Sequence, residues 1–514
     1  MLYPIGIQDF ESLRKNGFVY VDKTALIYKL ASTGRYYFLG RPRRFGKSLL
    51  LSTMEAYFRG KKELFEGLAI AELEQKWQTH PVLRLDLGGK AYDKEDVLDK
   101  VLDDILSRWE AEYGVENRSD VAGLRFGNVI EAACRQTGHP VVILIDEYDK
   151  PIVDNLGDEA LADVFRRQLQ GFYSAMKSQD AFIRFGFLTG VTNIGKLSVF
   201  SGLNNLKDIS MDVRYTDICG ISEEDLKSCF DESVGELAEA NGLSVKETYS
   251  QLAEMYDGYH FHQNSAGIYN PFSVLNTFDS GEFKEYWFET GTPSFLVRYF
   301  QRGNYLLDDL TTNAVPASKL SGANYEQPDA VTLLYQSGYL TIKGYDDRFR
   351  LYSLDYPNEE VKTGFLQSLS RFYLPAMETR GDLSVYRFIM DIENGDVNAL
   401  MNRLTALFAS REYPLEGDRE IIFENTLSTL FQLLGMQVQT ERHTSGGRAD
   451  IILESSRFVY VLELKRDQSA DAALAQLEKN GYYLPFLAGG KKIFKIGVNF
   501  SSDTQCIDSW KVGD

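Results

Sequence analysis

A glycine-bounded loop at residues 40–48 constrains this chain more than any other feature. The loop reads Gly-Arg-Pro-Arg-Arg-Phe-Gly-Lys-Ser, and it lies between an aromatic, strand-like run at 36–38 and an amphipathic, helix-like run at 49–58. This order is typical of a phosphate-binding loop, because the free N–H groups at the start of a helix point toward an anion. In this interpretation Lys47 reaches the β- and γ-phosphates of a nucleotide and Ser48 binds its magnesium ion.

The loop departs from the usual pattern at one position. The pattern expects glycine where Arg41 stands, and the nearest glycine, Gly40, comes one residue early. The alternative interpretation is a surface loop that happens to end in Gly-Lys-Ser. If the loop binds a nucleotide, the candidate contacts are Gly40, Arg41, Arg43, Arg44, Phe45, Gly46, Lys47 and Ser48.

Two acidic residues follow a second strand-like segment. Residues 141–145 form a continuous aliphatic run typical of a strand that is buried on both faces of a parallel sheet, and Asp146 and Glu147 come next. One further strand and two helices are predicted, at 81–87, 93–113 and 121–136. This alternation predicts a three-layer α/β domain with ligands at the carboxyl ends of the strands. There Asp146 can hold magnesium through water, while Glu147 orients or deprotonates the water that attacks the γ-phosphate. The alternative is a pair of solvated strand caps.

A fourth strand is predicted at 182–188, and Thr-Gly-Val-Thr-Asn follows it at 189–193. A polar residue at this strand end would lie between the loop and the acidic pair, where it could sense the γ-phosphate. Asn193 is our candidate. Thr189 and Thr192 remain alternatives, as does a turn of small polar residues without such a role.

Several of these segments resemble a known family. Residues 20–24 (Tyr-Val-Asp-Lys-Thr), the loop at 41–48, residues 145–149 (Ile-Asp-Glu-Tyr-Asp) and the run from Thr189 to Asn205 look like bacterial AAA-ATPase-like proteins that carry a C-terminal PD-(D/E)XK nuclease-like domain. That family also lacks the first glycine of the loop, so the resemblance implies that Arg41 is compatible with nucleotide binding. It further implies a P-loop domain that binds and hydrolyses ATP. It implies no other substrate.

The length of the chain sets its domain organisation. Its 514 residues, 44% of them hydrophobic, can form about three or four domains of ~150 residues. We predict a P-loop domain, a helical lid with a winged-helix-like part, and a nuclease-like domain, at 1–215, 216–380 and 381–514. Within the middle region we expect Ser222 to cap a helix, Trp287 to help pack the lid onto its neighbour, and 333–354 to form a hairpin with a packing role.

Charge and composition limit the partners. The net charge of −19 argues against constitutive coating of nucleic acid, because non-specific affinity needs a surplus of Lys and Arg. Any such contact must therefore be local. The chain starts without a basic leader, has no apolar run of ~20 residues, and has four cysteines without metal-ligand spacing. We expect a cytoplasmic protein with no membrane contact and no structural zinc.

The last 130 or so residues indicate a second chemistry. Residues 446–453 and 458–465 are predicted as two strands joined by a short polar turn. Because side chains alternate across a strand, Glu463 and Lys465 share one face, and Asp450 on the adjoining strand can complete the cluster. Two carboxylates can bind a divalent cation while the ammonium group acts on a phosphate, as metal-assisted phosphodiester hydrolysis requires. The alternative is an edge strand with alternating charges.

This segment resembles the core of the PD-(D/E)XK nucleases. The resemblance maps Asp450, Glu463 and Lys465 onto the catalytic triplet, Gln476 onto a helix glutamine and Glu424 onto an acid of the first helix. Ala449 stands where the motif has proline. Residues 381–514 hold 14 Lys and Arg against 19 Asp and Glu, a net charge of −5, so affinity for nucleic acid must come from the metal ion and from Lys491, Lys492 and Lys495.

Two functional hypotheses remain open. In the first, ATP hydrolysis with magnesium gates a metal-dependent nuclease that acts on nucleic acid, with DNA favoured over RNA. In the second, the chain is a nucleotide-dependent switch whose nuclease-like domain only binds nucleic acid, a protein partner or another copy of the chain. The intact triplet favours the first hypothesis, and the acidic charge favours the second.

Overall fold

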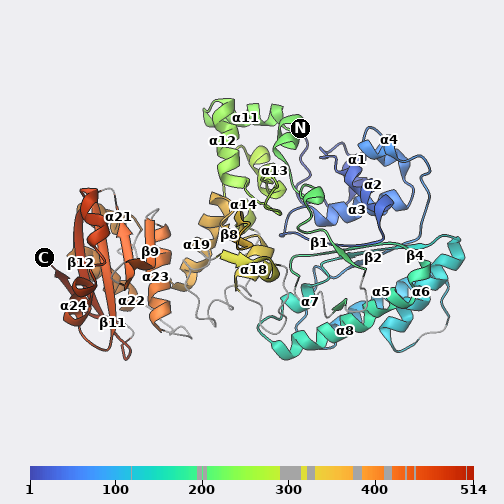
Figure 1. Cartoon of the computed structure of the whole chain (residues 1–514). Helices are drawn as coiled ribbons and strands as arrows, with labels where there is room; N and C mark the ends of the chain where they lie inside the picture. Colours follow the sequence, from blue (N-terminus) through green and yellow to red (C-terminus); the bar gives the residue numbers. More distant parts are fainter. Residues whose placement is uncertain are drawn as a thin grey trace. The chain divides into compact units, whose positions relative to one another are not determined.

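The computed structural model describes residues 1–116, 119–193, 199–200, 205–289, 314–320, 330–373, 385–409, 419–433, 437–444, 447–455, 457–504 and 506–513. They form two compact units (Figure 1). The first holds the described residues up to 289 together with 314–362, and the second holds those from 363 onward. The domain boundaries proposed from the sequence stay predictions.

A parallel five-stranded sheet forms the centre of the first unit. Its strands are β1 (Tyr36–Gly40), β2 (Val82–Asp86), β3 (Val141–Asp146), β4 (Ile183–Gly190) and β5 (Lys207–Asp208), in the spatial order β2-β3-β4-β1-β5. Each neighbouring pair is parallel, so the carboxyl ends of all five strands meet at one edge. The predicted α/β fold is confirmed, and β4 does lie between β1 and β3.

Helices cover both faces of this sheet. In Figure 1 one face carries α1 (Phe10–Lys15), α2 (Thr24–Thr33), α3 (Lys47–Phe58) and α4 (Ala69–Leu73), and the other carries α5 (Val97–Tyr113), α6 (Ala122–Thr137), α7 (Lys150–Val153) and α8 (Glu159–Ser178). Every residue of β3 is buried, as its uninterrupted aliphatic run predicts. The two helices expected at 93–113 and 121–136 are α5 and α6.

A helical region follows the sheet. It contains α10 (Glu223–Cys229), α11 (Asp231–Asn241), α12 (Val245–Tyr256), α13 (Pro271–Ser280) and α14 (Tyr286–Glu289). Ser222 caps α10 as predicted: its hydroxyl accepts the Asp225 N–H while the Asp225 carboxylate accepts the Ser222 N–H. The apolar faces of these helices share one core built around Leu226, Phe230 and Leu252.

A small winged-helix-like part completes the first unit. It runs β6 (Ala314–Pro316), α17 (Ala317–Leu320), α18 (Ala330–Ser337), β7 (Thr341–Asp346) and β8 (Leu351–Asp355), with sheet order β6-β8-β7, before α19 (Glu359–Tyr373) begins. The predicted hairpin is β7 and β8, but its start at 333 was wrong, because residues 333–337 belong to α18. Every residue of α18 except Tyr335 is buried. This helix therefore has no open face for a DNA groove, which favours the predicted packing role.

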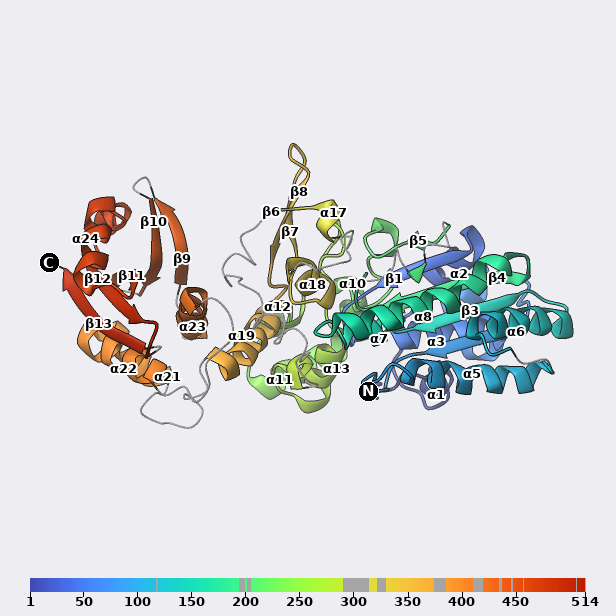
Figure 2. The ribbon, with the colours of Figure 1, turned by 90° about the horizontal axis from the view of Figure 1, so that it is seen from below.

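The second unit has a mixed five-stranded sheet. Its strands are β9 (Gln437–Thr444), β10 (Gly447–Glu454), β11 (Phe458–Arg466), β12 (Lys492–Ser501) and β13 (Cys506–Gly513), in the order β13-β12-β11-β10-β9, with only β11 and β12 parallel. Its helices are α21 (Val385–Asn394), α22 (Val397–Ala409), α23 (Arg419–Leu433) and α24 (Ala470–Asn480). Figure 2 shows α24 and α22 on opposite sides of the strands. In neither unit is any described helix long and apolar enough to cross a membrane.

Candidate nucleotide and nuclease sites

The loop after β1 has the backbone of an anion-binding turn. Helix α3 begins at Lys47, two residues earlier than expected, and Gly46 is its N-cap with φ = +89°. Arg44 also lies in the left-handed region, with φ = +68°. Alternation of left- and right-handed residues turns successive N–H groups toward one concave side. A side chain at position 46 would strain this backbone even though the space beside Gly46 is open.

Arg41, the residue in place of the first glycine, is buried and stabilises the loop through hydrogen bonds. Its guanidinium donates hydrogen bonds to the carbonyls of Ser210 (2.8 Å) and Tyr215 (3.0 Å), and it lies 3.8 Å from the centre of the Phe261 ring. Burial lowers the pKa of Arg41 to about 10, which still leaves it charged at neutral pH. The side chain therefore acts on the shape of the loop, and it binds the segment after β5.

Lys47 is held inside the loop by the loop's own carbonyls. Its Nζ donates to the carbonyl oxygens of Arg41 and Pro42, both at 2.9 Å, and the side chain is only 7% exposed. Burial lowers the pKa of Lys47, and the nearby charges of Asp146 and Glu147 oppose that change. The ammonium group is thus positioned before any phosphate arrives, and phosphate oxygens can replace the carbonyls as acceptors.

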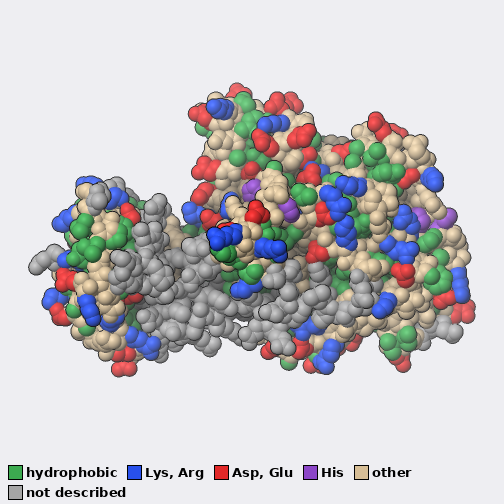
Figure 3. All heavy atoms as spheres, viewed as in Figure 1, with side chains coloured by type: hydrophobic (Ala, Val, Ile, Leu, Met, Phe, Trp, Pro, Cys, Tyr) green, Lys and Arg blue, Asp and Glu red, His purple; other side chains and the backbone are tan. Residues whose placement is uncertain are grey.

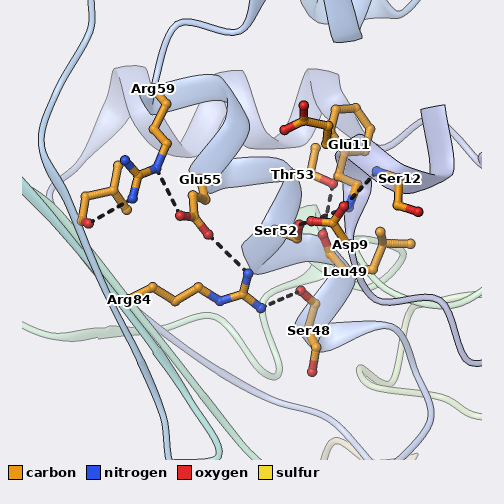
Figure 4. A network of polar contacts seen from close by, with 12 residues as sticks. Asp9, Glu11, Ser12, Ser48, Leu49, Ser52, Thr53, Glu55, Arg59 and Arg84 are labelled. Atoms are coloured by element: carbon orange, nitrogen blue, oxygen red, sulfur yellow. Dashed lines mark hydrogen bonds and ion pairs between the residues drawn. The ribbon is translucent and has the colours of Figure 1, made fainter. Parts of the chain in front are cut away.

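Polar contacts anchor α3 to the sheet and to the N-terminal segment (Figure 4). Arg84 on β2 pairs with Glu55 at 3.1 Å and donates to the Ser48 carbonyl at 3.4 Å. On another side of the helix, the Ser52 hydroxyl accepts the Phe10 N–H at 2.9 Å. These contacts fix the helix whose first turn carries Lys47 and Ser48.

Aromatic residues of the middle region pack on the outside of the loop. The Phe45 ring is buried edge-on against Tyr259 (4.8 Å) and Phe261 (5.7 Å), and the Arg44 guanidinium lies 4.8 Å from the Phe272 ring centre. The side chains of Phe45 and Arg44 therefore hold the loop to the helical region, which leaves their backbone N–H groups as the parts of these two residues that could face a nucleotide.

The acidic pair stands at the end of β3 beside the loop. Asp146 is buried, and its Oδ1 accepts a hydrogen bond from the Thr189 hydroxyl at 2.6 Å. Glu147 has φ = +51°, a strained conformation for a residue with a side chain. Burial raises the pKa of the Glu147 carboxyl, while the Lys47 charge lowers it. A carboxylate with a raised pKa is better suited to accept a proton from water.

Asp149 ties the end of β3 to the end of β4. Its buried carboxylate accepts the N–H groups of Val191 (3.1 Å) and Thr192 (2.6 Å) and the Thr192 hydroxyl (2.8 Å). Burial raises the pKa of Asp149 and the bonds from Thr192 lower it. These contacts hold the strand end that leads into Asn193.

Asn193 lies where the sequence predicted it, at the strand end between the loop and the acidic pair. It is buried, its N–H donates to Gln336 Oε1 on α18 at 2.8 Å, and its Oδ1 has no hydrogen-bond partner among the described residues. The residue borders a cavity of about 380 Å³ that Gly40 and Arg41 also line. A buried amide oxygen without a partner is costly, so the Asn193 Oδ1 is suited to accept a hydrogen bond from a ligand.

The oxygen ligands at this site fit a magnesium–nucleotide complex. Ser48 offers a hydroxyl at the start of α3 and Asp146 a buried carboxylate on β3; phosphate oxygens and water would complete the shell. No group of three or more His, Cys, Asp or Glu side chains suited to a metal occurs in the described parts of the chain. Magnesium usually keeps several waters and takes only one or two carboxylates, so such a group is not required.

The second site lies on β10 and β11. The antiparallel register pairs Ile451 with Leu462, and its extension by one residue places Asp450 opposite Glu463 on the same face of the sheet. The Asp450 Oδ2 accepts the Leu464 N–H at 2.6 Å. Lys465 is on this face too, with its Nζ 3.5 Å from Glu463 Oε1. The predicted sharing of one face by these three side chains is confirmed.

Glu463 is the most deeply buried of the three side chains Asp450, Glu463 and Lys465. It is 1% exposed, and within the described residues neither carboxylate oxygen has a hydrogen bond of regular geometry. Burial and the charge of Asp450 raise the pKa of Glu463 to about 7, against lowering contributions from Lys465 and from Gln476 on α24. Gln476 therefore does face the cluster. The side chain of Glu424 on α23 lies outside the described residues.

The lysines proposed to attract nucleic acid have acidic or aromatic neighbours. Lys491 lies 3.4 Å from Glu454, Lys495 lies 3.0 Å from Glu478, and the Lys492 ammonium is 4.7 Å from the Phe494 ring centre. Part of their charge is thus neutralised within the unit, so they form a weaker phosphate-binding edge than their number suggests.

Comparison with known proteins finds a family match for each of the two regions that hold these sites. A family model described as a predicted AAA-ATPase matches residues 4–200, and a model of the PD-(D/E)XK nuclease superfamily matches residues 418–510. The "Uncharacterized protein in vnfD 5'region" of Azotobacter chroococcum mcd 1 is 36% identical to this chain over 520 residues, which cover 98% of this chain and 97% of that protein. The chain belongs to this AAA-ATPase-like family.

Some residues of this AAA-ATPase-like chain that shape the sites carry no signal in the sequence for that position. Two residues of the middle region contact the candidate nucleotide site. Gln336 Oε1 lies 2.8 Å from the Asn193 backbone nitrogen, and the Trp287 indole nitrogen lies 3.1 Å from the Arg43 carbonyl oxygen. The sequence placed Trp287 at a packing surface without a partner and gave no signal for Gln336 or Arg84. Of the family segments, residues 194–198, which include Lys196, and residues 201–204 lie outside the described residues.

Proposed function

We propose that this chain binds and hydrolyses ATP with magnesium and that the nucleotide state controls a magnesium-dependent nuclease in its C-terminal unit. One observation carries the first half: the loop, Asn193 and the Asp146–Glu147 pair end three adjacent strands, in the order β1, β4 and β3. A triphosphate bound along this edge would contact the Lys47 ammonium group, then the Asn193 amide, and then the Asp146–Glu147 pair.

The chain's own groups have distinct roles in hydrolysis. Lys47 and the N–H groups of the loop bind the β- and γ-phosphates, and Ser48 and Asp146 hold the cation. Magnesium, when bound, neutralises the charge that develops on the phosphate oxygens. Glu147 orients a water and accepts its proton as the water attacks the γ-phosphorus; the bond to the β-phosphate oxygen breaks, and ADP and phosphate leave.

The cluster on β10 and β11 supports the second half of the proposal. Asp450 and Glu463 would hold a divalent cation, Lys465 would stabilise the phosphate in the transition state, and Gln476 would help orient the cluster. A bound cation would stabilise the charged form of Glu463, which burial disfavours in its absence. The substrate would be nucleic acid, with DNA favoured over RNA.

A second function deserves a test because of the charge in this unit. Lys491 and Lys495 lie beside acids, so the surface offers little cationic excess to a nucleic acid. In this alternative the chain is a nucleotide-dependent switch, and its nuclease-like unit binds nucleic acid, a protein or another copy of the chain without cleaving anything.

Cleavage assays distinguish the nuclease function from the switch function. The full chain is incubated with single-stranded DNA, double-stranded DNA and RNA, with magnesium or manganese, with and without ATP. We expect metal-dependent cleavage of DNA that Lys465→Ala abolishes, with Lys511→Ala, an exposed lysine paired with Asp471, as the matched control. Binding without cleavage by the wild-type chain under every condition would favour the switch.

A further inference from the structure

One carbonyl of the phosphate-binding loop is held from outside by a tryptophan. The indole N–H of Trp287, on α14, donates a hydrogen bond to the Arg43 carbonyl oxygen at 3.1 Å. Arg43 precedes Arg44, whose backbone is in the left-handed region. The contact joins residues that are 244 positions apart in the sequence, and it reaches the middle of the loop between Arg41 and Gly46.

The contact also sets the direction of an N–H group. A peptide bond is planar and trans, so the carbonyl of Arg43 and the N–H of Arg44 point in opposite directions. When Trp287 holds the Arg43 carbonyl toward the middle region, the Arg44 N–H is directed to the other side of the peptide plane. That N–H belongs to the concave turn that the left-handed residues create.

Trp287 is itself fixed by a buried carboxyl group. Its backbone N–H donates to Glu360 Oε1 at 2.9 Å, and the Ser273 hydroxyl lies 2.8 Å from both oxygens of the same group. Glu360 is fully buried. The Trp287 ring packs against Tyr339 with 5.1 Å between ring centres. The indole therefore has little freedom to leave the Arg43 carbonyl.

We propose that Trp287 is a positioning residue for the nucleotide: its indole N–H orients the Arg43–Arg44 peptide so that the Arg44 N–H binds a phosphate oxygen of ATP. This inference rests on the proposed ATP site. It assigns to the middle region a part in nucleotide affinity, and the activation of the attacking water stays with Glu147.

The test compares two Trp→Phe variants of the full chain. Trp287→Phe keeps a ring in the packed position and removes the N–H donor. Trp109→Phe is the matched control, because Trp109 on α5 is also buried and packs on Phe126. Calorimetric titration with Mg-ATP should show about threefold to tenfold weaker binding for Trp287→Phe, the effect of one hydrogen bond, and wild-type binding for the control.

Steady-state kinetics provides a readout that loss of packing alone would not reproduce. Trp287→Phe should raise the KM for ATP by the same factor and change kcat by less than about twofold. The chain has four tryptophans, so ATP should also change the fluorescence of the wild type and of Trp109→Phe, and this change should be lost in Trp287→Phe.

A second pair of variants keeps the inference falsifiable if Trp287→Phe folds poorly. Glu360→Gln retains an acceptor for the Trp287 N–H and should bind ATP like the wild type, whereas Glu360→Leu should weaken binding. Equal ATP affinity in wild type, Trp287→Phe and Glu360→Leu would overturn the positioning role and leave the ATP site intact. A wild-type chain that binds no ATP would overturn the proposed function and this inference together.

Discussion

The two candidate sites differ in how their charged groups are held. In the nucleotide site Lys47 has two carbonyl acceptors at 2.9 Å, and Asp149 accepts three hydrogen bonds from Val191 and Thr192. In the nuclease site the Glu463 carboxylate is as deeply buried, faces a second carboxylate, and has no regular hydrogen bond among the described residues.

Lys47 and Asp149 of the nucleotide site are therefore hydrogen-bonded before a ligand binds, whereas the charged Glu463 carboxylate of the nuclease site would be stabilised by a bound ligand. The nucleotide loop keeps its shape through contacts with its own backbone and with the middle region. The nuclease cluster instead carries an electrostatic cost, because burial and Asp450 both disfavour a charged Glu463. A divalent cation would remove that cost, so the second unit should respond to metal in its stability as well as in its activity.

The largest effect is expected from Lys47→Ala in the nucleotide site. Loss of the positioned ammonium group should weaken Mg-ATP binding or slow turnover by at least about a hundredfold, as the removal of a preorganised charged donor does elsewhere. Lys15→Ala, an exposed lysine on α1, is the control. Titration calorimetry measures Mg-ATP affinity and phosphate release measures turnover. Equal values for wild type and Lys47→Ala would show that the loop does not bind the nucleotide.

A smaller effect concerns metal and the stability of the second unit. Magnesium or manganese should raise the unfolding temperature of this unit in the full chain, by an amount equivalent to ~2.7 kcal/mol at one hundred times the dissociation constant. Asp450→Ala should abolish the increase, and Lys465→Ala should preserve it, because Lys465 acts on phosphate. Scanning calorimetry reports this, and indifference of the wild type to divalent ions would make the cluster an ordinary buried ion pair.

The smallest effect is a pH dependence in metal-free buffer with chelator. The pKa of Glu463 is about 7 in the folded chain and near 4.5 in the unfolded chain, so between these values the folded state binds more protons. The second unit should therefore lose stability as pH rises from about 4.5 to 7, by at most ~2.6 kcal/mol. Glu463→Gln should flatten this part of the profile. A wild-type stability that rises with pH over the same interval would contradict the raised pKa.

Local sequence patterns predicted the strands and helices of both sites. The tertiary structure determines which other residues these elements contact. The aliphatic run before Asp146 and the alternation around Glu463 are properties of a few neighbouring residues, and both strands formed as expected. The hairpin start at 333 was wrong because an apolar run of that length suits a buried helix equally well. The place of β4 between β1 and β3 was predicted, but the rest of the strand order was open from the sequence, since it depends on which strands pair across the sheet.

The contacts of Arg41 and Trp287 depend on residues far away in the sequence and could not be predicted from local patterns. Arg41 bonds to carbonyls about 170 positions away and Trp287 to one 244 positions away. The left-handed backbone of Glu147 is likewise imposed by its surroundings, because no local signal favours φ > 0 for glutamate. The sequence placed Arg41 and Glu147 at a candidate site and Trp287 at a packing surface, and only the tertiary structure showed which groups they contact.

The most direct test of the central claim, that the β1, β4 and β3 ends form an ATP-hydrolysing site, is single-turnover hydrolysis by the wild type and by Glu147→Gln, with Mg-ATP affinity measured on the same samples. Gln keeps the shape of the side chain but cannot take a proton from water. We predict affinity within about twofold and hydrolysis slowed by at least about a hundredfold. Equal hydrolysis rates in the two proteins, or no ATP binding by the wild type, would contradict the account.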